Sequence, residues 1–280
     1  METARLILDP AADGAWNMSV DQALLETANS TGLISLRFYT WSEPTLSLGY
    51  FQSHLDRKLH PPSLDCPLVR RRTGGGAILH DNELTYSLCV PSDNRWSKRN
   101  SELYRLVHRC IVQLLDEFGI ESHLYGDVEQ SQPFGIDPTE ESEQQSGIKP
   151  PNEQNEHVSD ISVPTVDQNS FMCFKRRSDG DIVTKRYKVV GSAQRRIKKS
   201  LLQHGSILQK RSRFAPNLKG IQDLSNFGLN PKELSRLLAA RVFKCLHVQA
   251  FEGTLKAPEV EAAKRAHSLQ FSSEQWNHQR

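Results

Sequence analysis

The sequence lacks the long apolar run and the cysteine spacing that would indicate a membrane protein or a disulfide-rich one. No window of about eighteen apolar residues occurs, so we expect no membrane partner. The N-terminal segment METARLILDPAADG has no basic leader followed by an apolar core, which predicts a cytoplasmic protein. The five cysteines are odd in number and none is spaced as CxxC, which argues against a disulfide framework and a zinc site.

An excess of charge of one sign is also missing. The 35 Lys and Arg residues face 33 Asp and Glu residues, which leaves a formal charge of +2 and no reason to expect a nucleic-acid partner. The two common nucleotide-binding patterns, GxGxxG and GxxxxGK[ST], are absent. No His-x-x-x-His or paired-carboxylate pattern indicates a metal ion.

The chain has 280 residues, which is long enough to bury a full core. We expect a single domain over residues 1–280, interrupted by a disordered insert at 127–169. The insert is dominated by Glu, Gln, Ser and Pro and has few large apolar residues. Such a segment buries too little surface to offset the entropy lost on ordering.

Apolar periodicity outside the insert predicts alternating helices and strands. Helical spacing predicts helices at 13–31, 101–118, 231–245 and 258–269. The residue patterns predict strands at 34–39 and 84–90, a strand or a turn at 45–51, and a short extended run at 66–72. Ser101 is the expected N-cap of the second helix, and residues 213–228 are expected to form a loop.

Chemically versatile residue types gather between residues 173 and 208. Alternation of apolar and basic residues around Lys188 predicts a strand, and the Gly-Ser-Ala segment at 191–193 predicts a tight turn that lets the backbone approach a ligand. A basic turn is expected over 195–199, after which apolar residues return at 201–208. These patterns predict a β-hairpin with chemistry at one end.

The cysteine and the lysine of this stretch each have two interpretations. Cys173, between Met172 and Phe174, is most simply a small buried hydrophobic residue, but basic residues near it in the chain would stabilise a thiolate nucleophile. Lys188 is either an edge-strand residue that opposes aggregation or a positive charge offered to a carbonyl oxygen or a thiolate. The residue pattern leaves both choices open.

Three arginines precede three consecutive glycines at residues 70–76 (RRRTGGG). Glycines weaken helix and strand alike, so a backbone that curves around something is the simplest explanation. The loop is either a phosphate cradle built from free backbone N–H groups or a solvated arginine patch beside an ordinary hairpin loop. His80 and His204 are each more often structural hydrogen-bonding residues than catalysts.

Five segments match one known family in order along the chain. They are RFYTWSEPTLSLGYFQ at 37–52, RRRTGGGAILHDNELTYSLCVP at 70–91, KVVGSAQRR at 188–196, LLQHGSIL at 201–208 and EQWN at 274–277. Together they resemble the lipoate-protein ligase and octanoyltransferase family, which is itself similar to biotin protein ligases. The resemblance implies an α+β fold with mixed, mainly antiparallel sheets flanked by helices, the biotin/lipoate protein ligase catalytic-domain fold.

The family divides by chemistry. Ligases use ATP and Mg to activate free lipoate as an acyl-adenylate, whereas octanoyltransferases take the acyl group from octanoyl-acyl carrier protein onto a cysteine and need no cofactor. Both then acylate a lysine of a lipoyl-carrier protein, such as the glycine-cleavage H protein or a dehydrogenase lipoyl domain. The ELTYS segment at 83–87 and the Cys-Phe pair at 173–174 are similar to the cysteine-dependent branch, particularly the form that acts on the H protein.

The resemblance implies a set of site residues. Cys173 would carry the acyl group and Lys188 would support its thiolate. The residues expected to bind substrate are Arg71, Gly74, Gly75, Gly76, His80, Gly191, Ser192, Ala193, His204 and Gly205. Backbone N–H groups of the glycine loop and of 191–192 are expected to stabilise an oxyanion, and no metal site is expected.

Alternatives to this hypothesis stay open at the level of the sequence. An ATP-dependent lipoate ligase would use the loop at 70–76 to hold the adenylate phosphates. A protein without catalytic activity would bind acyl chains or carrier domains in the same groove. The basic residues Arg195, Arg196, Lys198 and Lys199 either face acidic carrier proteins or form a solvated turn.

Overall fold

The computed structural model describes residues 2–127 and 170–280. The strands are β1 (Thr3–Leu8), β2 (Ile34–Tyr39), β3 (Thr45–Leu48), β4 (Leu68–Arg70), β5 (Ile78–His80), β6 (Glu83–Val90), β7 (His123–Leu124), β8 (Ile182–Thr184), β9 (Tyr187–Ile197), β10 (Ser200–Leu208) and β11 (Gln249–Glu252). The helices are α1 (Gly14–Thr31), α2 (Asn100–Glu117), α3 (Ile221–Leu224), α4 (Pro231–Leu246), α5 (Ala257–Ala266) and α6 (Glu274–Asn277). The insert predicted at 127–169 lies, apart from residue 127, outside the described residues.

Two sheets organise the described chain. The large sheet has the order β11-β1-β2-β6-β10-β9-β8-β7, and the small sheet has the order β4-β3-β5. In the large sheet β1 runs parallel to β11 and to β2, while the pairs from β2 through β7 are antiparallel. The predicted α+β fold with mixed, mainly antiparallel sheets is therefore confirmed.

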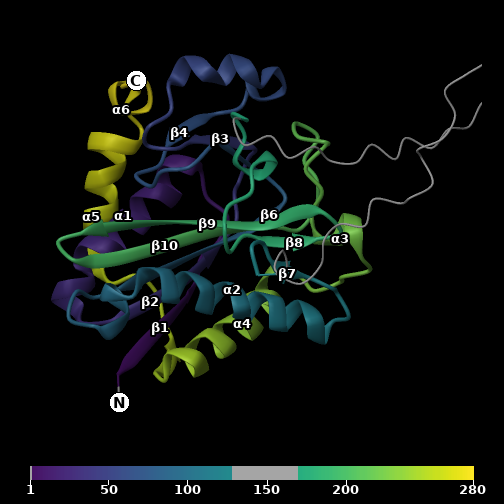
Figure 1. The fold of residues 1–280 in the computed structure, drawn as a ribbon. Helices are drawn as coiled ribbons and strands as arrows, with labels where there is room; N and C mark the ends of the chain where they lie inside the picture. Colours follow the sequence, from purple (N-terminus) through teal and green to yellow (C-terminus); the bar gives the residue numbers. More distant parts are fainter. Residues whose placement is uncertain (1, 128–169) are drawn as a thin grey trace, which may run out of the picture.

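Helices cover both faces of the large sheet (Figure 1). Helices α2 and α4 pack on one face, where they share the largest apolar core with Leu6 and Leu88. Helices α1 and α5 pack on the other face, where Ile7 and Cys89 join them. Because side chains alternate along a strand, neighbouring residues of β1 and β6 enter opposite cores. The central strands are consequently buried on both faces.

The predicted hairpin is present as β9 and β10, but its turn is shorter than expected. Lys198 and Lys199 form it alone, and both lie in the left-handed region, with φ of 47° and 72°. Such angles match the twist of paired strands in a two-residue connection. The predicted turn over 195–199 is wrong, because Arg195 and Arg196 still lie in β9.

The small residues at 191–193 lie inside β9, so the tight turn predicted there is also wrong. They pair with residues 204–206 of β10. The Lys188 side chain explains the glycine at 191, since a Cβ there would come within 2.5 Å of the Lys188 Cε. On the paired strand, a Cβ on Gly205 would come within 2.1 Å of the Ser192 hydroxyl oxygen. The small residues therefore indicate close side-chain contacts and not a change of chain direction.

The helix predictions are confirmed to within a few residues, with two exceptions. Helix α1 begins after Asp13, whose side chain accepts a hydrogen bond from the Trp16 N–H at 2.8 Å. The expected cap at Ser101 is wrong, because α2 starts one residue earlier, after Arg99. The short helix α3 lies in the segment 213–228 that was predicted as loop. Among the described residues no helix is both long and apolar enough to cross a membrane.

The small sheet lies at one end of the molecule together with α6 and two short 3-10 turns, η1 (His54–Leu59) and η2 (Pro61–Ser63) (Figure 1). Its core includes Leu46, Ala77 and Met172. The last of these comes directly before the 3-10 turn η4 (Cys173–Lys175), so the small sheet fixes the position of the cysteine.

Candidate active site

Cys173 is held against the glycine loop by the backbone. The Cys173 N–H donates to the Ala77 carbonyl at 2.7 Å, and the Ala77 N–H donates to the Phe171 carbonyl at 2.9 Å. Gly76 lies against this bridge so closely that a Cβ there would come within 3.0 Å of the Cys173 nitrogen. The thiol, which is partly exposed, therefore has a fixed position beside the loop.

Lys188 reaches the thiol from β9. Its ammonium nitrogen lies 3.6 Å from the Cys173 sulfur and 3.4 Å from the Cys173 carbonyl oxygen. The same nitrogen forms a buried ion pair with Asp181 at 2.8 Å. Burial alone would lower the pKa of Lys188, but its interactions with Cys173 and Asp181 outweigh burial and raise that pKa. Lys188 is thus a stable cation next to the sulfur.

Asp181 was not anticipated from the sequence. Its side chain is 2% exposed and accepts hydrogen bonds from the Ser178 N–H at 2.7 Å and the Tyr104 hydroxyl at 3.3 Å. These contacts fix the carboxylate that holds Lys188. The sequence gives only a weak indication, because the aspartate comes directly before the β-branched residues Ile-Val-Thr at 182–184 and follows a polar run.

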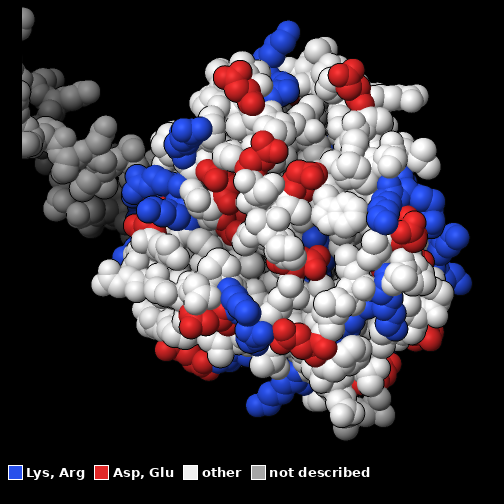
Figure 2. All heavy atoms as spheres, turned by 180° about the vertical axis from the view of Figure 1, so that it is seen from behind, with Lys and Arg blue, Asp and Glu red and all other residues white. Residues whose placement is uncertain are grey.

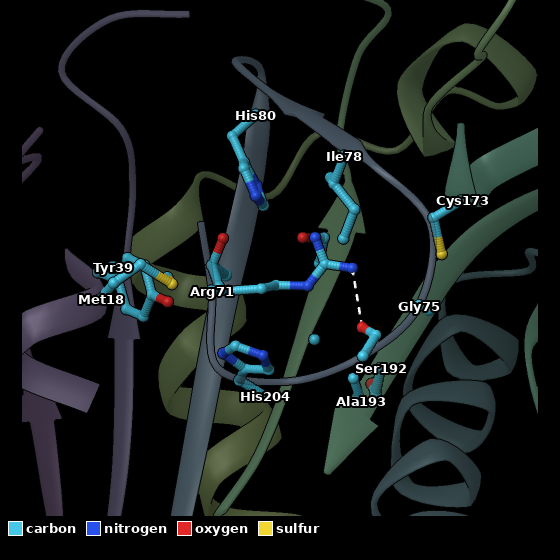
Figure 3. Close-up of a pocket in the computed structure, with 15 residues that line it drawn as sticks. Met18, Tyr39, Arg71, Gly75, Ile78, His80, Cys173, Ser192, Ala193 and His204 are labelled. Atoms are coloured by element: carbon cyan, nitrogen blue, oxygen red, sulfur yellow. Dashed lines mark hydrogen bonds between the residues drawn. The ribbon is translucent and has the colours of Figure 1, made fainter. Parts of the chain in front are cut away.

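Arg71 is a buried cation inside the glycine loop (Figure 3). Its guanidinium donates to the carbonyls of Gly74 and Gly76 at 2.9 and 2.6 Å, and to Ser47. No described carboxylate pairs with it, and burial lowers its pKa to about 10. The loop curves around this side chain, which supplies a positive charge near Cys173 that no carboxylate of the described residues neutralises.

A pocket opens between the loop, Cys173 and the hairpin. It is lined by Met18, Tyr39, Arg71, Gly74, Gly75, Ile78, His80, Thr85, Cys173, Gly191, Ser192, Ala193, His204, Gly205 and Ser206. All but two of the predicted site residues thus line a single cavity. The exceptions, Lys188 and Gly76, contact Cys173 from outside this lining. The sequence did not indicate Met18, Tyr39 or Thr85.

The two predicted histidines have both ring nitrogens engaged by protein groups. His80 contacts Glu83 at 2.7 Å and Ser47 at 2.8 Å, and burial lowers its pKa. His204 contacts Thr73 at 2.7 Å and Asp21 at 3.2 Å. Because neither ring has a free nitrogen, their geometry suits the walls of the pocket better than proton transfer to a substrate.

A third histidine, His108 of α2, was missed by the sequence interpretation. Its Nδ1 lies 2.6 Å from the Gly180 carbonyl, which can only accept, so Nδ1 carries the proton. Its Nε2 therefore accepts from the Ser192 hydroxyl at 2.6 Å. Burial lowers the pKa of His108 to about 4, so it is neutral near pH 7. Helix α2 thereby fixes one wall of the pocket.

Comparisons with known proteins agree with this fold and site. The family model described as the lipoyl protein ligase A/B catalytic domain matches residues 13–213. Octanoyltransferase LipM of Halalkalibacterium halodurans is 30% identical over 304 residues, which cover 99% of each chain. Octanoyltransferase LipM of Staphylococcus aureus is 34% identical over 74% of this chain and 66% of its own.

These matches define the protein as an enzyme of the acyltransferase class. The chain belongs to the family of the lipoyl protein ligase A/B catalytic domain. The resemblance drawn from its motifs is thereby confirmed.

Solved structures carry the same fold. Ta0514 of T. acidophilum, titled a putative lipoate protein ligase, superposes with a TM-score of 0.70 at 21% identity and covers 100% of both chains. A lipoate-protein ligase A bound with ATP has a TM-score of 0.66 at 22% identity and covers 99% of both. At these identities the likeness extends to the fold alone, and the predicted ligase-type catalytic-domain fold is confirmed.

Proposed function

We propose that the protein transfers an octanoyl group from octanoyl-acyl carrier protein to a lysine of a lipoyl-carrier protein, through a thioester on Cys173. The observation that carries the proposal is the contact between the Lys188 ammonium and the Cys173 sulfur, 3.6 Å apart beside the pocket. The relatives that match its full length are named octanoyltransferases. Their donor would already be a thioester, so the reaction would need neither ATP nor Mg.

The first half-reaction is attack of the Cys173 thiolate on the octanoyl thioester. Lys188 stabilises the thiolate, and the oxyanion that forms can receive hydrogen bonds from the loop. Within the described residues the N–H groups of Gly75 and Gly76 donate to no acceptor, so they are available for this role. As the carbon–sulfur bond of the donor breaks, its thiolate takes a proton from Lys188.

The second half-reaction uses the neutral Lys188 as a base. In the acyl-enzyme the sulfur carries no charge, so one of the two anions that raise the pKa of Lys188 is gone. Lys188 can then accept a proton from the amine of the incoming carrier lysine as that amine attacks the thioester. The amide forms, the Cys173 thiolate leaves, and the ion pair is restored. The acceptor would be the glycine-cleavage H protein or a dehydrogenase lipoyl domain.

Intact-mass measurement after incubation with octanoyl-acyl carrier protein tests the proposal. We expect an octanoyl adduct on the wild-type protein and none on Cys173→Ala. Cys245→Ala is the matched control, because Cys245 is an exposed thiol outside the pocket, and it should form the adduct normally. Full lipoylation by Cys173→Ala with free lipoate and ATP would instead establish a lipoate ligase.

A further inference from the structure

Large apolar side chains are exposed beside the pocket. Phe51, Leu55 and Leu59 are 70%, 58% and 69% exposed, and the last two lie on η1. The Phe51 ring lies over the glycine loop, 3.8 Å from the position that a Cβ on Gly74 would take. Since Gly74 lines the pocket, Phe51 borders the pocket directly, and Leu55 and Leu59 follow it along the chain on η1. Exposed apolar patches of this kind mark interaction sites.

Arginines gather at the edge of the patch around Tyr50. The guanidinium carbons of Arg280 and Arg195 lie 5.0 and 5.4 Å from the centre of the Tyr50 ring. Arg72 stacks on Trp276, whose ring centre is 5.9 Å from that of Tyr50. Burial lowers the pKa of Arg72, the charge of Glu26 opposes this, and the charge of Arg195 adds to the lowering. These guanidinium groups therefore repel one another.

The described residues contain little acidic compensation for this cluster, since Glu26 acts on Arg72 through its charge but forms no ion pair with it. Among the ion pairs of residues 2–127 and 170–280, none involves Arg72, Arg195 or Arg280. In the view from behind, acidic side chains gather near the middle of the face, and lysines and arginines are most numerous toward its two sides (Figure 2). Positive charge is thus concentrated locally, which favours an anionic partner at the cluster.

We propose that this surface docks the donor carrier protein and the phosphodiester of its phosphopantetheine arm. We call it the Tyr50 surface, after the ring around which the arginines gather. It consists of Tyr50 and the residues Phe51, Leu55, Leu59, Arg72, Arg195 and Arg280. The inference rests on the proposed function, because the arm would deliver its thioester to Cys173. Guanidinium groups bind phosphate through paired hydrogen bonds. The acceptor is recognised through a lysine and brings no phosphate, so the chemistry of the cluster fits the donor.

The arrangement also explains why apolar and basic residues adjoin. The carrier body would contribute a surface that is acidic and partly apolar, and the arm would pass from the arginines across Gly74 into the pocket. Charge complementarity of this kind raises the rate of encounter and makes it sensitive to salt. A donor without a carrier body would gain little from the surface.

Two donors separate docking from chemistry. The double variant Leu59→Ser/Arg280→Glu should lower kcat/KM for octanoyl-acyl carrier protein about tenfold or more. With octanoyl-pantetheine, which lacks both carrier body and phosphate, its rate of acyl-adduct formation should match that of the wild type. Arg241→Glu, a charge reversal on α4 away from the Tyr50 surface, is the matched control and should leave both donors unaffected.

The other outcomes overturn the proposal in different ways. An equal loss with both donors would mean that the surface supports the site and not the carrier. A raised KM for the lipoyl-carrier protein with normal use of the donor would assign the surface to the acceptor. If the wild-type protein formed no adduct from either donor, the proposed function would itself be wrong, and the docking role with it.

Discussion

At the scale of single residues, the site depends on a buried carboxylate that the sequence did not reveal. Cys173 and Lys188 could be selected from their residue types and from family motifs, and the structure places them in contact. Asp181 and His108 could not, because their importance comes from burial and from partners far along the chain. A charged run such as 175–181 does not show which of its members faces inward.

Asp181→Asn tests whether the carboxylate maintains Lys188 as a cation. Burial lowers the pKa of Lys188, and the charge of Asp181 counteracts this effect. Without that charge the pKa of Lys188 should fall. The ammonium would then be lost at a lower pH, so the alkaline limb of the pH–rate profile should move toward lower pH. We expect kcat for octanoyl transfer to fall about 100-fold or more, as on loss of a general acid, with little change in KM. Steady-state kinetics across pH measures both effects.

The neighbouring Asp179→Asn is a matched control for that variant. Asp179 is 69% exposed and pairs with Arg105 at the surface, so it shares the segment with Asp181 but not the contact with Lys188. Its profile should coincide with that of the wild type. A purely structural role for Asp181 would lower the rate without moving the alkaline limb, and that result would contradict the assignment.

At the scale of elements, the glycine loop curves around a side chain of its own. The sequence predicted a backbone bent around something, with a phosphate as one option. In the structure the carbonyls of Gly74 and Gly76 accept from the Arg71 guanidinium, which occupies the inside of the curve. The glycine pattern therefore predicted the bend correctly. It did not predict that the bend encloses Arg71, because the pattern does not show which of the three arginine side chains lies inside the loop.

Gly76→Ala should disrupt the site while Gly74→Ala should not. A methyl group at 76 would meet the Phe171 oxygen and the Cys173 nitrogen at 3.0 Å, and both belong to backbone that holds the thiol. The Cys173 sulfur would move away from Lys188, and misplacement of this size commonly costs about 100-fold in rate. A methyl at 74 meets only the Phe51 ring, at 3.8 Å.

Rates of octanoyl-adduct formation for the two alanine variants provide the comparison. Both substitutions add the same group to the same loop, so a general loss of loop flexibility would affect them alike. Similar slowing of both variants would show that the contact with Cys173 is not the reason for the third glycine.

Strand patterns predicted the antiparallel hairpins better than the rest of the large sheet. The hairpin of β9 and β10 was anticipated because its pairing is local. Strand β11 was missed because its four residues are all exposed, so they show no apolar face. It pairs with β1, which lies more than 240 residues earlier in the chain. Strand pairing between residues so far apart in the chain cannot be predicted from a local sequence pattern.

At the scale of the whole molecule, buried ion pairs connect the sheet to the helices behind it. Arg5 of β1 pairs with Glu259 of α5 at 2.6 Å, and Arg37 of β2 pairs with Asp21 of α1 at 2.8 Å. All four side chains are nearly inaccessible. Asp21 also contacts His204, so this network reaches the wall of the pocket. Removing Glu259 would leave Arg5 buried without a described acidic partner, and removing Asp21 would leave Arg37 with Asp9 alone. Loss of a partner from a buried ion pair is strongly destabilising.

Asp21 should make the stability of the protein depend on pH. Burial alone would raise the pKa of Asp21, but the hydrogen bond to His204 and the charge of Arg37 outweigh it and hold the pKa below 3.8. A lowered folded-state pKa means that the contribution is present above pH 3.8 and is lost as pH falls through the folded-state value. Asp21→Asn should lower the free energy of unfolding at pH 7 by about 3 kcal/mol.

The difference in stability between the wild type and Asp21→Asn should therefore depend on pH in a predictable way. Urea unfolding at pH 7, 5, 4 and 3 measures the free energy of unfolding of both proteins. The difference between them should stay constant down to about pH 4 and become smaller below it. Protonation of Asp21 at low pH removes the negative charge from the wild type, and the variant lacks that charge at every pH. Asp116→Asn, a change at an exposed carboxylate of α2, should track the wild type throughout. A gap that stayed constant to pH 3 would mean that the charge of Asp21 does not stabilise the fold, and that its contribution comes from packing and hydrogen bonding which asparagine cannot reproduce.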